Sequence, residues 1–220
     1  MANPYLFKYC ERAGDASMWA EPINTASNIA FLIAAYFAYR SFSKNNPGFK
    51  KSFDIVFLIL NLFTIGIGSA IYHMFATHAT MLMDVIPITI FINVYLLSFV
   101  VRILHQKIGL ALLVWILFQG VNAAFVMYVP ETALNGSVMY APAYSMLLVF
   151  LGLMAVQKNA EVKAMAAAVG IFTTSLLMRT FDHALCNLTG FGTHFGWHLL
   201  NGLLLYVLLQ MLIRAAAKKA

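Results

Sequence analysis

Hydrophobic positions along the chain fall into seven long runs that contain almost no charged residues. These runs lie near residues 22–42, 53–74, 80–102, 108–128, 137–156, 163–185 and 194–214. An α-helix of about 20 apolar residues is long enough to cross the hydrocarbon core of a bilayer. The pattern therefore predicts an all-α membrane protein, a bundle of seven transmembrane helices that forms a single domain over residues 1–220.

The composition agrees with this prediction, since 62% of the residues are hydrophobic, 10% are charged and the mean hydropathy is +0.80. Lys and Arg residues occur in the first, third and fifth loops between the predicted spans and in the C-terminal tail, whereas the other loops have none. By the positive-inside rule, the basic loops and the C-terminus are cytoplasmic and the N-terminus lies outside. The net charge of +6 thus reflects membrane topology and does not indicate a nucleic-acid partner.

Residues 1–21 mix polar and apolar side chains, and no basic stretch precedes the first apolar run. This pattern predicts an extracytoplasmic N-terminal segment and no cleavable signal peptide. Cys10 lies in this segment and Cys186 follows the sixth span, so both cysteines are expected on the outer side. Two cysteines in an oxidising compartment are a candidate disulfide pair, although topology alone leaves open whether the bond forms.

Ionisable residues gather at the outer ends of several predicted spans. His73 ends the second span, Asp84 lies near the start of the third, and His194 and His198 begin the seventh. The predicted topology brings all four to the same leaflet from different helices. Because ionisable groups are costly inside a bilayer, this cluster predicts a functional site.

The spacing of the histidines indicates a metal site. His194 and His198 are four residues apart, so both project from one face of a helix, and His73 provides a third nitrogen. Three protein ligands leave the fourth position of a tetrahedral zinc open to water, as in catalytic sites. Asp84 is a candidate base for that water or an acceptor that orients a histidine, and Ser69 is a candidate oxyanion donor.

Several of these residues also have purely structural interpretations. A pair of histidines four residues apart also caps helices or forms hydrogen bonds within a bundle. Ser69 lies between small residues that permit close helix packing, beside Gly68. Asp182 is expected to pair with Arg179, one turn earlier on the same helix. Two further histidines on the outer side are spare ligand candidates: His78 and His183.

Short motifs along nearly the whole chain resemble those of the alkaline ceramidase family. They are Tyr9-Cys10-Glu11, the segment Glu21-Pro22-Ile23-Asn24-Thr25-Ala26-Ser27-Asn28, the segment Gly68-Ser69-Ala70-Ile71-Tyr72-His73 with Asp84 and Pro87, Phe181-Asp182 with Cys186, and His194-x-x-x-His198. They occur in the family's order. The family belongs to a wider group of seven-span hydrolases that also includes adiponectin-type receptors.

This resemblance implies that His73, His194 and His198 hold zinc, that Asp84 polarises the attacking water and that Ser69 stabilises the oxyanion. It implies hydrolysis of the ceramide amide to a sphingoid base and a fatty acid. It also supports a disulfide between Cys10 and Cys186.

Family members can also hold calcium near the N-terminus, and Glu11 and Glu21 match two of its carboxylate positions. Lys8 and Ala13 stand where eukaryotic members have an acid and an asparagine. The short tails and loops look more like a bacterial relative. They predict a multi-pass protein of the bacterial plasma membrane, with its site facing the extracytoplasmic side.

Other functions remain open on the sequence alone. One is a seven-span receptor or scaffold whose zinc is structural, and another is a hydrolase of a different lipid amide or ester. A zinc transporter is disfavoured, because no acid, histidine or lysine lies well inside the cytoplasmic halves of the spans. The expected partner is a lipid that enters from the membrane, and the sequence does not indicate an oligomeric state.

Overall fold

The computed structural model describes residues 8–45, 48 and 50–217, and within these residues the regular elements are helices, with no strand. Six helices are long and apolar enough to cross a membrane within this part of the chain. They are α3 (Phe53–Phe75), α4 (His78–Arg102), α5 (Ile108–Tyr128), the continuous segment Ala133–Val156 that contains η3 (Ala133–Tyr140) and α6 (Ala141–Val156), α7 (Val162–Thr180) and α9 (His194–Ala217). These correspond to the second to seventh predicted spans.

The first predicted span is helical but divided into α1 (Pro22–Ser27) and α2 (Ile29–Asn45). The division has a local cause at Asn28. Its side-chain amide donates to the carbonyl of Asn24, as does the hydroxyl of Ser27, while its backbone N–H bonds to Thr25 instead. Side chains thus compete with the backbone for the carbonyl that would continue the helix. The break brings Ser27 to the candidate site.

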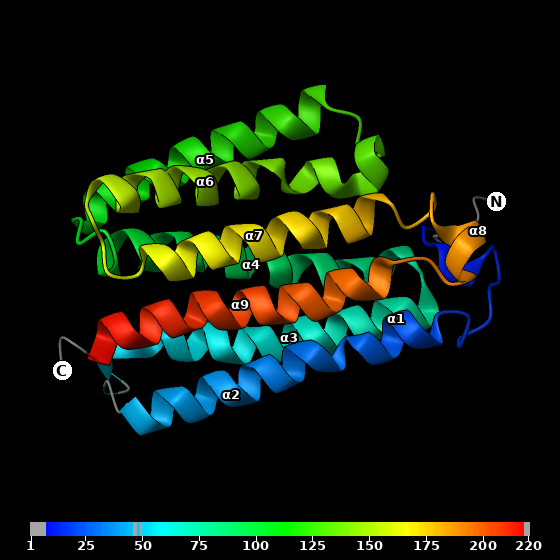
Figure 1. Cartoon of the computed structure of the whole chain (residues 1–220), viewed down its shortest axis with the longest axis horizontal. Helices are drawn as coiled ribbons and strands as arrows, with labels where there is room; N and C mark the ends of the chain where they lie inside the picture. The colour runs from blue at the N-terminus through cyan, green and yellow to red at the C-terminus, as the bar shows by residue number, and fades with distance from the viewer. Residues whose placement is uncertain (1–7, 46–47, 49, 218–220) are drawn as a thin grey trace.

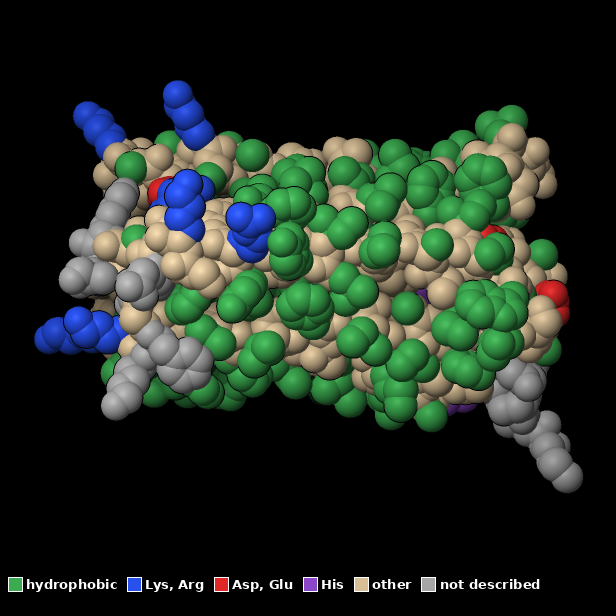
Figure 2. All heavy atoms as spheres, turned by 90° about the horizontal axis from the view of Figure 1, so that it is seen from below, with side chains coloured by type: hydrophobic (Ala, Val, Ile, Leu, Met, Phe, Trp, Pro, Cys, Tyr) green, Lys and Arg blue, Asp and Glu red, His purple; other side chains and the backbone are tan. Residues whose placement is uncertain are grey.

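The long helices run side by side along one axis, with α9 between α2 and α7 (Figure 1). The helix α5 lies at an edge of the bundle, and Ala111 is its only fully buried residue. The described N-terminal segment, with η1 (Cys10–Arg12), lies beside the short helix α8 (Cys186–Thr189) at one end of the bundle. The last turns of α9 lie at the opposite end, where Lys and Arg side chains gather on the face drawn in Figure 2.

A close helix contact places the C-terminal half of α3 against α4. A side chain at Gly68 would overlap the backbone carbonyl of Met83, so the two helices pack there with no room for a Cβ atom. Ser69 and His73 follow on α3, and Asp84 follows on α4. The absence of a side chain at Gly68 therefore brings these three residues to one place.

Candidate metal centre

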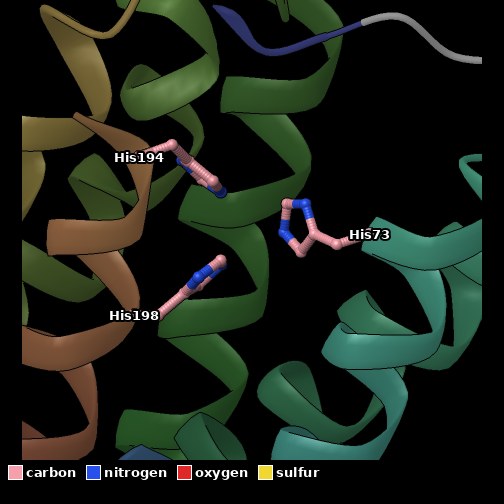
Figure 3. A group of neighbouring side chains, drawn as sticks. All are labelled: His73, His194 and His198. Atoms are coloured by element: carbon pink, nitrogen blue, oxygen red, sulfur yellow. The ribbon is translucent and has the colours of Figure 1, made fainter. Parts of the chain in front are cut away.

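Three buried histidines from two helices form the centre of the candidate site. His73 lies in the last turn of α3, and His194 and His198 lie in the first turns of α9. Each contributes a ring nitrogen, and these nitrogens all lie within 4.8 Å of one another (Figure 3). Each residue is only 1% exposed. The convergence expected from the topology is therefore present in the folded chain.

The proton positions on two of these rings follow from their outer hydrogen bonds. His73 Nδ1 lies 2.6 Å from the carboxylate of Glu21, which only accepts, so Nδ1 carries the proton. His198 Nδ1 lies 2.7 Å from the hydroxyl of Ser27. That hydroxyl already donates its proton to Asn24, so it accepts from His198. In both rings Nε2 therefore keeps a free lone pair, as a metal ligand requires.

The site leaves buried ring nitrogens without a hydrogen-bond partner among the described residues. These are Nε2 of His73 and Nδ1 of His194. Leaving a buried polar group unpaired costs about 1–3 kcal/mol. Imidazole nitrogens in a three-ligand cluster are a donor set that zinc favours. The residues present thus fit a metal ion such as zinc.

The carboxylate of Asp182 holds the start of α9. One of its oxygens accepts from the backbone N–H groups of Thr193 and His194, and the other accepts from the N–H of Cys10. A side chain at Gly192, where φ is +73°, would overlap this carboxylate. The expected pair between Asp182 and Arg179 was wrong, because the first N–H groups of α9 need an acceptor and Asp182 provides it.

Ser69 and Asp84, the two other predicted catalytic residues, lie next to the histidines. Ser69 is buried one turn before His73. Asp84 interacts electrostatically with His73 and with the hydroxyl of Ser69, and its Oδ1 is buried without a hydrogen-bond partner. The chain thus provides a carboxylate and a hydroxyl beside the candidate metal ligands.

The residues that matched a calcium site are instead paired within the protein. The Arg12 guanidinium is 1% exposed and bonds to Glu21 at 2.6 Å. It also donates to four backbone carbonyls, those of Asp15, Ser17, His73 and Met74. Burial would raise the pKa of the Glu21 carboxyl, but its bonds from His73 and Arg12 outweigh burial and hold the pKa below its usual value.

Glu11 is also paired, since its two carboxylate oxygens accept from the N–H groups of Ile23 and Asn24 in the first turn of α1. Burial nevertheless raises the pKa of Glu11 above its usual value. With Glu21 held by an arginine and Glu11 by backbone donors, the described residues do not fit a calcium ion. The positive charge beside Glu21 is that of Arg12.

The N-terminal segment covers the histidines. Cys10 and Cys186 form a disulfide that joins this segment to α8. The adjacent Tyr9 ring stacks on His194, with 3.7 Å between the ring centroids. Of the two spare ligand candidates, His183 bonds to the carbonyl of Lys8 and is not part of the cluster. His78 is exposed at the start of α4 and also lies outside it.

Two adjoining cavities lie near the cluster, and residues that neighbour the histidines line them: Tyr9 in one and Trp197 in the other. The larger, here called the outer cavity, has about 660 Å³ and lies between α4, α5 and the η3–α6 segment, with Lys8, Tyr9 and Arg179 in its walls. The smaller, the apolar slot, has about 70 Å³ and is lined almost entirely by hydrophobic side chains, including Trp197. The two share four lining residues: Ile88, Ile92, Tyr140 and Ala143.

A family model described as Ceramidase matches residues 7–220. The chain belongs to the ceramidase family. Because the match covers nearly all of the chain, the family and its hydrolase character apply to the whole bundle and not to one motif. No curated protein sequence matches closely enough to add to this assignment.

Sequence reasoning overlooked several residues that support the site. Ser27 was noted only as part of a family motif and Glu21 only as a possible calcium ligand in such a motif, yet they hold two of the three histidine rings. Tyr9 and Arg12 precede the first helix, where hydropathy carries no information about contacts. A signal did exist for Glu21, since a buried acid beside a transmembrane bundle requires a partner.

Proposed function

We propose that this ceramidase-family protein is a zinc-dependent amidohydrolase that cleaves the N-acyl amide of ceramide or a ceramide-like lipid. The products are a free fatty acid and a sphingoid base. The observation that carries the proposal is the buried cluster of His73, His194 and His198, whose unpartnered ring nitrogens converge beside Asp84. When bound there, zinc supplies Lewis-acid activation of water and of the amide carbonyl.

In this mechanism Asp84 acts as the general base and then as the general acid. Its carboxylate takes a proton from the attacking water and delivers one to the leaving amine nitrogen as the C–N bond breaks. The hydroxyl of Ser69 donates to the developing oxyanion. Glu21 and Ser27 keep the imidazole rings of His73 and His198 in the orientation and tautomer that binding requires.

We further propose that the single domain 1–220 crosses the membrane seven times, with α1 and α2 together forming the first crossing. These two helices extend over residues 22–45 and carry exposed apolar side chains such as Ile29, Ile33 and Phe37. The basic end of the bundle faces the cytoplasm and the histidines face outward, consistent with a bacterial plasma membrane. The lipid substrate then enters laterally and occupies the outer cavity, with part of its acyl chain reaching the adjoining apolar slot.

The test combines metal content with turnover on detergent-purified protein. We expect near-stoichiometric zinc by elemental mass spectrometry and release of fatty acid from labelled ceramide. His198→Ala should lose zinc and activity together, whereas Asp84→Asn should keep zinc and lose about 10²- to 10⁴-fold in kcat. His78→Ala, at an exposed histidine outside the cluster, is the matched control and should retain both.

Each alternative predicts a different result. Retained zinc with no cleavage of any lipid amide or ester would indicate the receptor or scaffold, whose zinc is structural. Cleavage of other lipid amides or esters in preference to ceramide would keep the mechanism and change the substrate. A well-folded wild-type protein without zinc would contradict the proposal.

A further inference from the structure

Arg179 lines the outer cavity and forms no salt bridge among the described residues, although the Asp84 carboxylate lies near enough to interact with it electrostatically. It lies at the end of α7, and its Nη1 donates to the hydroxyl of Tyr9 at 3.0 Å. Its Nε is buried and has no hydrogen-bond partner. The four ion pairs of the described chain involve other residues. This differs from Arg12, whose guanidinium is fully paired.

Aromatic rings hold the Arg179 guanidinium in position without neutralising it. Its central carbon lies 5.7, 5.6 and 5.3 Å from the ring centroids of Tyr9, Tyr140 and Trp197. Such contacts stabilise a cation through the ring quadrupole but provide no counter-charge. An arginine offers five N–H donors in a planar fork that matches carboxylate, phosphate or similar oxyanions. A preformed arginine with unused donors is therefore suited to bind an anion.

The same rings connect Arg179 to the histidine cluster. Tyr9 stacks on His194 and contacts Arg179, so a single ring separates the guanidinium from a candidate metal ligand. Trp197 lies next to His198 in the sequence and also contacts the guanidinium. A group bound by Arg179 would therefore lie close to the position where the amide is cleaved.

The walls of the outer cavity add a second cation. Lys8 lines it, and the Lys8 ammonium donates to the sulfur of Met81 and interacts electrostatically with Asp84. The acid in this lining is Glu131, which is exposed in the loop before η3 and forms no ion pair with Arg179. The apolar slot joins the cavity at Tyr140. A lipid could then extend its chains into the slot and its headgroup toward the two cations.

We propose that Arg179 and Lys8 form an anion-binding subsite that selects N-acyl lipids whose headgroup carries a negative charge. This inference rests on the proposed amidohydrolase function and names its substrate class. A phosphate, a sulfonate or a carboxylate close to the amide all satisfy the shared chemistry. A neutral ceramide would leave the free donors of Arg179, its buried Nε among them, without an anionic acceptor, which is unfavourable.

The experiment compares lipids that have the same chains and differ only in headgroup charge. Ceramide, ceramide 1-phosphate, an N-acyl aminosulfonate and an N-acyl amino acid are presented in the same detergent micelles. Binding is followed by the change in tryptophan fluorescence, since Trp197 contacts Arg179, and hydrolysis is followed by release of labelled fatty acid. We expect the anionic lipids to bind about 10- to 100-fold more tightly than ceramide. Comparison of the three anionic lipids identifies which anion is preferred.

Variants separate recognition from structure. Arg179→Gln should remove the preference for anionic lipids mainly through KM, Arg179→Lys should retain part of it, and Lys8→Gln should weaken it. Zinc content and melting temperature are measured in each variant, and Arg40→Gln, at an exposed arginine on α2, is the matched control. If Arg179→Gln does not fold, Arg179→Lys and Lys8→Gln still test the preference.

The failure of this inference is distinguishable from the failure of the proposed function. Equal binding of neutral and anionic lipids by the wild type, or an undiminished preference in folded Arg179→Gln, would overturn the subsite. Tight, Arg179-dependent binding of anionic lipids without hydrolysis of any of them would preserve the subsite and overturn the hydrolase.

Discussion

At the scale of single residues, hydrogen bonds from Arg12 to Glu21 and from His73 to Glu21 join the N-terminal segment to a candidate metal ligand. Arg12 neutralises Glu21, and Glu21 accepts the Nδ1 proton of His73. An unpaired buried carboxylate would instead attract a proton from its surroundings or hold the imidazole as an imidazolium, which cannot bind a metal. Arg12 is therefore a positioning residue that acts on the metal centre through Glu21.

Replacing Arg12 tests whether these hydrogen bonds support the metal centre. We expect Arg12→Gln to weaken zinc affinity by about 10- to 100-fold, as loss of a partner of a metal ligand typically does. Competition with a chelator, read by elemental analysis, measures this effect. Arg40→Gln is the surface control and should bind zinc as the wild type does.

The response of the protein to calcium is a second test of the pairing between Arg12 and Glu21. Because Arg12 already supplies the charge beside Glu21, added calcium or its chelation should leave the melting temperature and zinc content of the wild type unchanged. Calcium-dependent stabilisation of the wild type would contradict our conclusion that these residues do not fit the ion.

At the scale of helices, the contact between α3 and α4 decides the geometry of the proposed catalytic groups. The backbones meet at Gly68, opposite the carbonyl of Met83. Asp84 directly follows Met83 on α4 and interacts electrostatically with His73, which lies five residues after Gly68 on α3. Ser69 had two interpretations in the sequence, as a packing residue and as a donor, and its buried position beside Asp84 is compatible with both.

A methyl group at Gly68 would push these helices apart. Gly68→Ala should destabilise the protein by about 1–3 kcal/mol, as overpacking does. It should also lower kcat, because Asp84 moves away from Ser69 and His73. Gly120→Ala in α5 is the control, since no atom lies within 4 Å of the added group, and its stability should match or slightly exceed that of the wild type. Melting temperature and turnover are measured together, and wild-type values for Gly68→Ala would contradict the argument.

At the scale of the whole molecule, the N-terminal segment closes the end of the bundle that holds the histidines. The disulfide between Cys10 and Cys186 fixes it to α8, and the carboxylate of Asp182 fixes it to the start of α9. Tyr9 and Arg12 reach the site from this one segment. The position of a short segment outside the helices therefore affects the histidines, the outer cavity and the proposed anion subsite together.

Breaking the disulfide should affect stability and the site together. Its two cysteines are 176 residues apart, and removing a cross-link of this kind costs about 2–4 kcal/mol. We expect Cys10→Ser and Cys186→Ser to lower the melting temperature by similar amounts and to weaken zinc binding, because the covering segment loosens. Reductant should lower the wild-type melting temperature and leave the variants unchanged. A reductant-insensitive wild type would show that the bond does not contribute.

Much of the fold could be predicted because its signals are local. Spans two to seven follow from hydropathy, and the i, i+4 spacing places His194 and His198 on one helix face. The meeting of these residues with His73 follows from topology, and the three-histidine cluster confirms it. The roles of Asp84 and Ser69, and the identity of the metal, stay predictions. The expected pair of Asp182 and Arg179 was wrong because helical spacing does not reveal competing acceptors and donors in distant loops.

The sequence by itself determined the helices, the family and the residues that meet at the histidine cluster, because hydrophobicity and helical periodicity act over neighbouring residues. Only the tertiary structure decided how those residues are paired. In the folded chain Glu21 bonds to Arg12 and His73, Ser27 bonds to His198, and Arg179 faces a cavity. The physical reason is that buried charges and donors are satisfied by whichever partners packing brings within hydrogen-bond distance, and those partners are far apart in the chain.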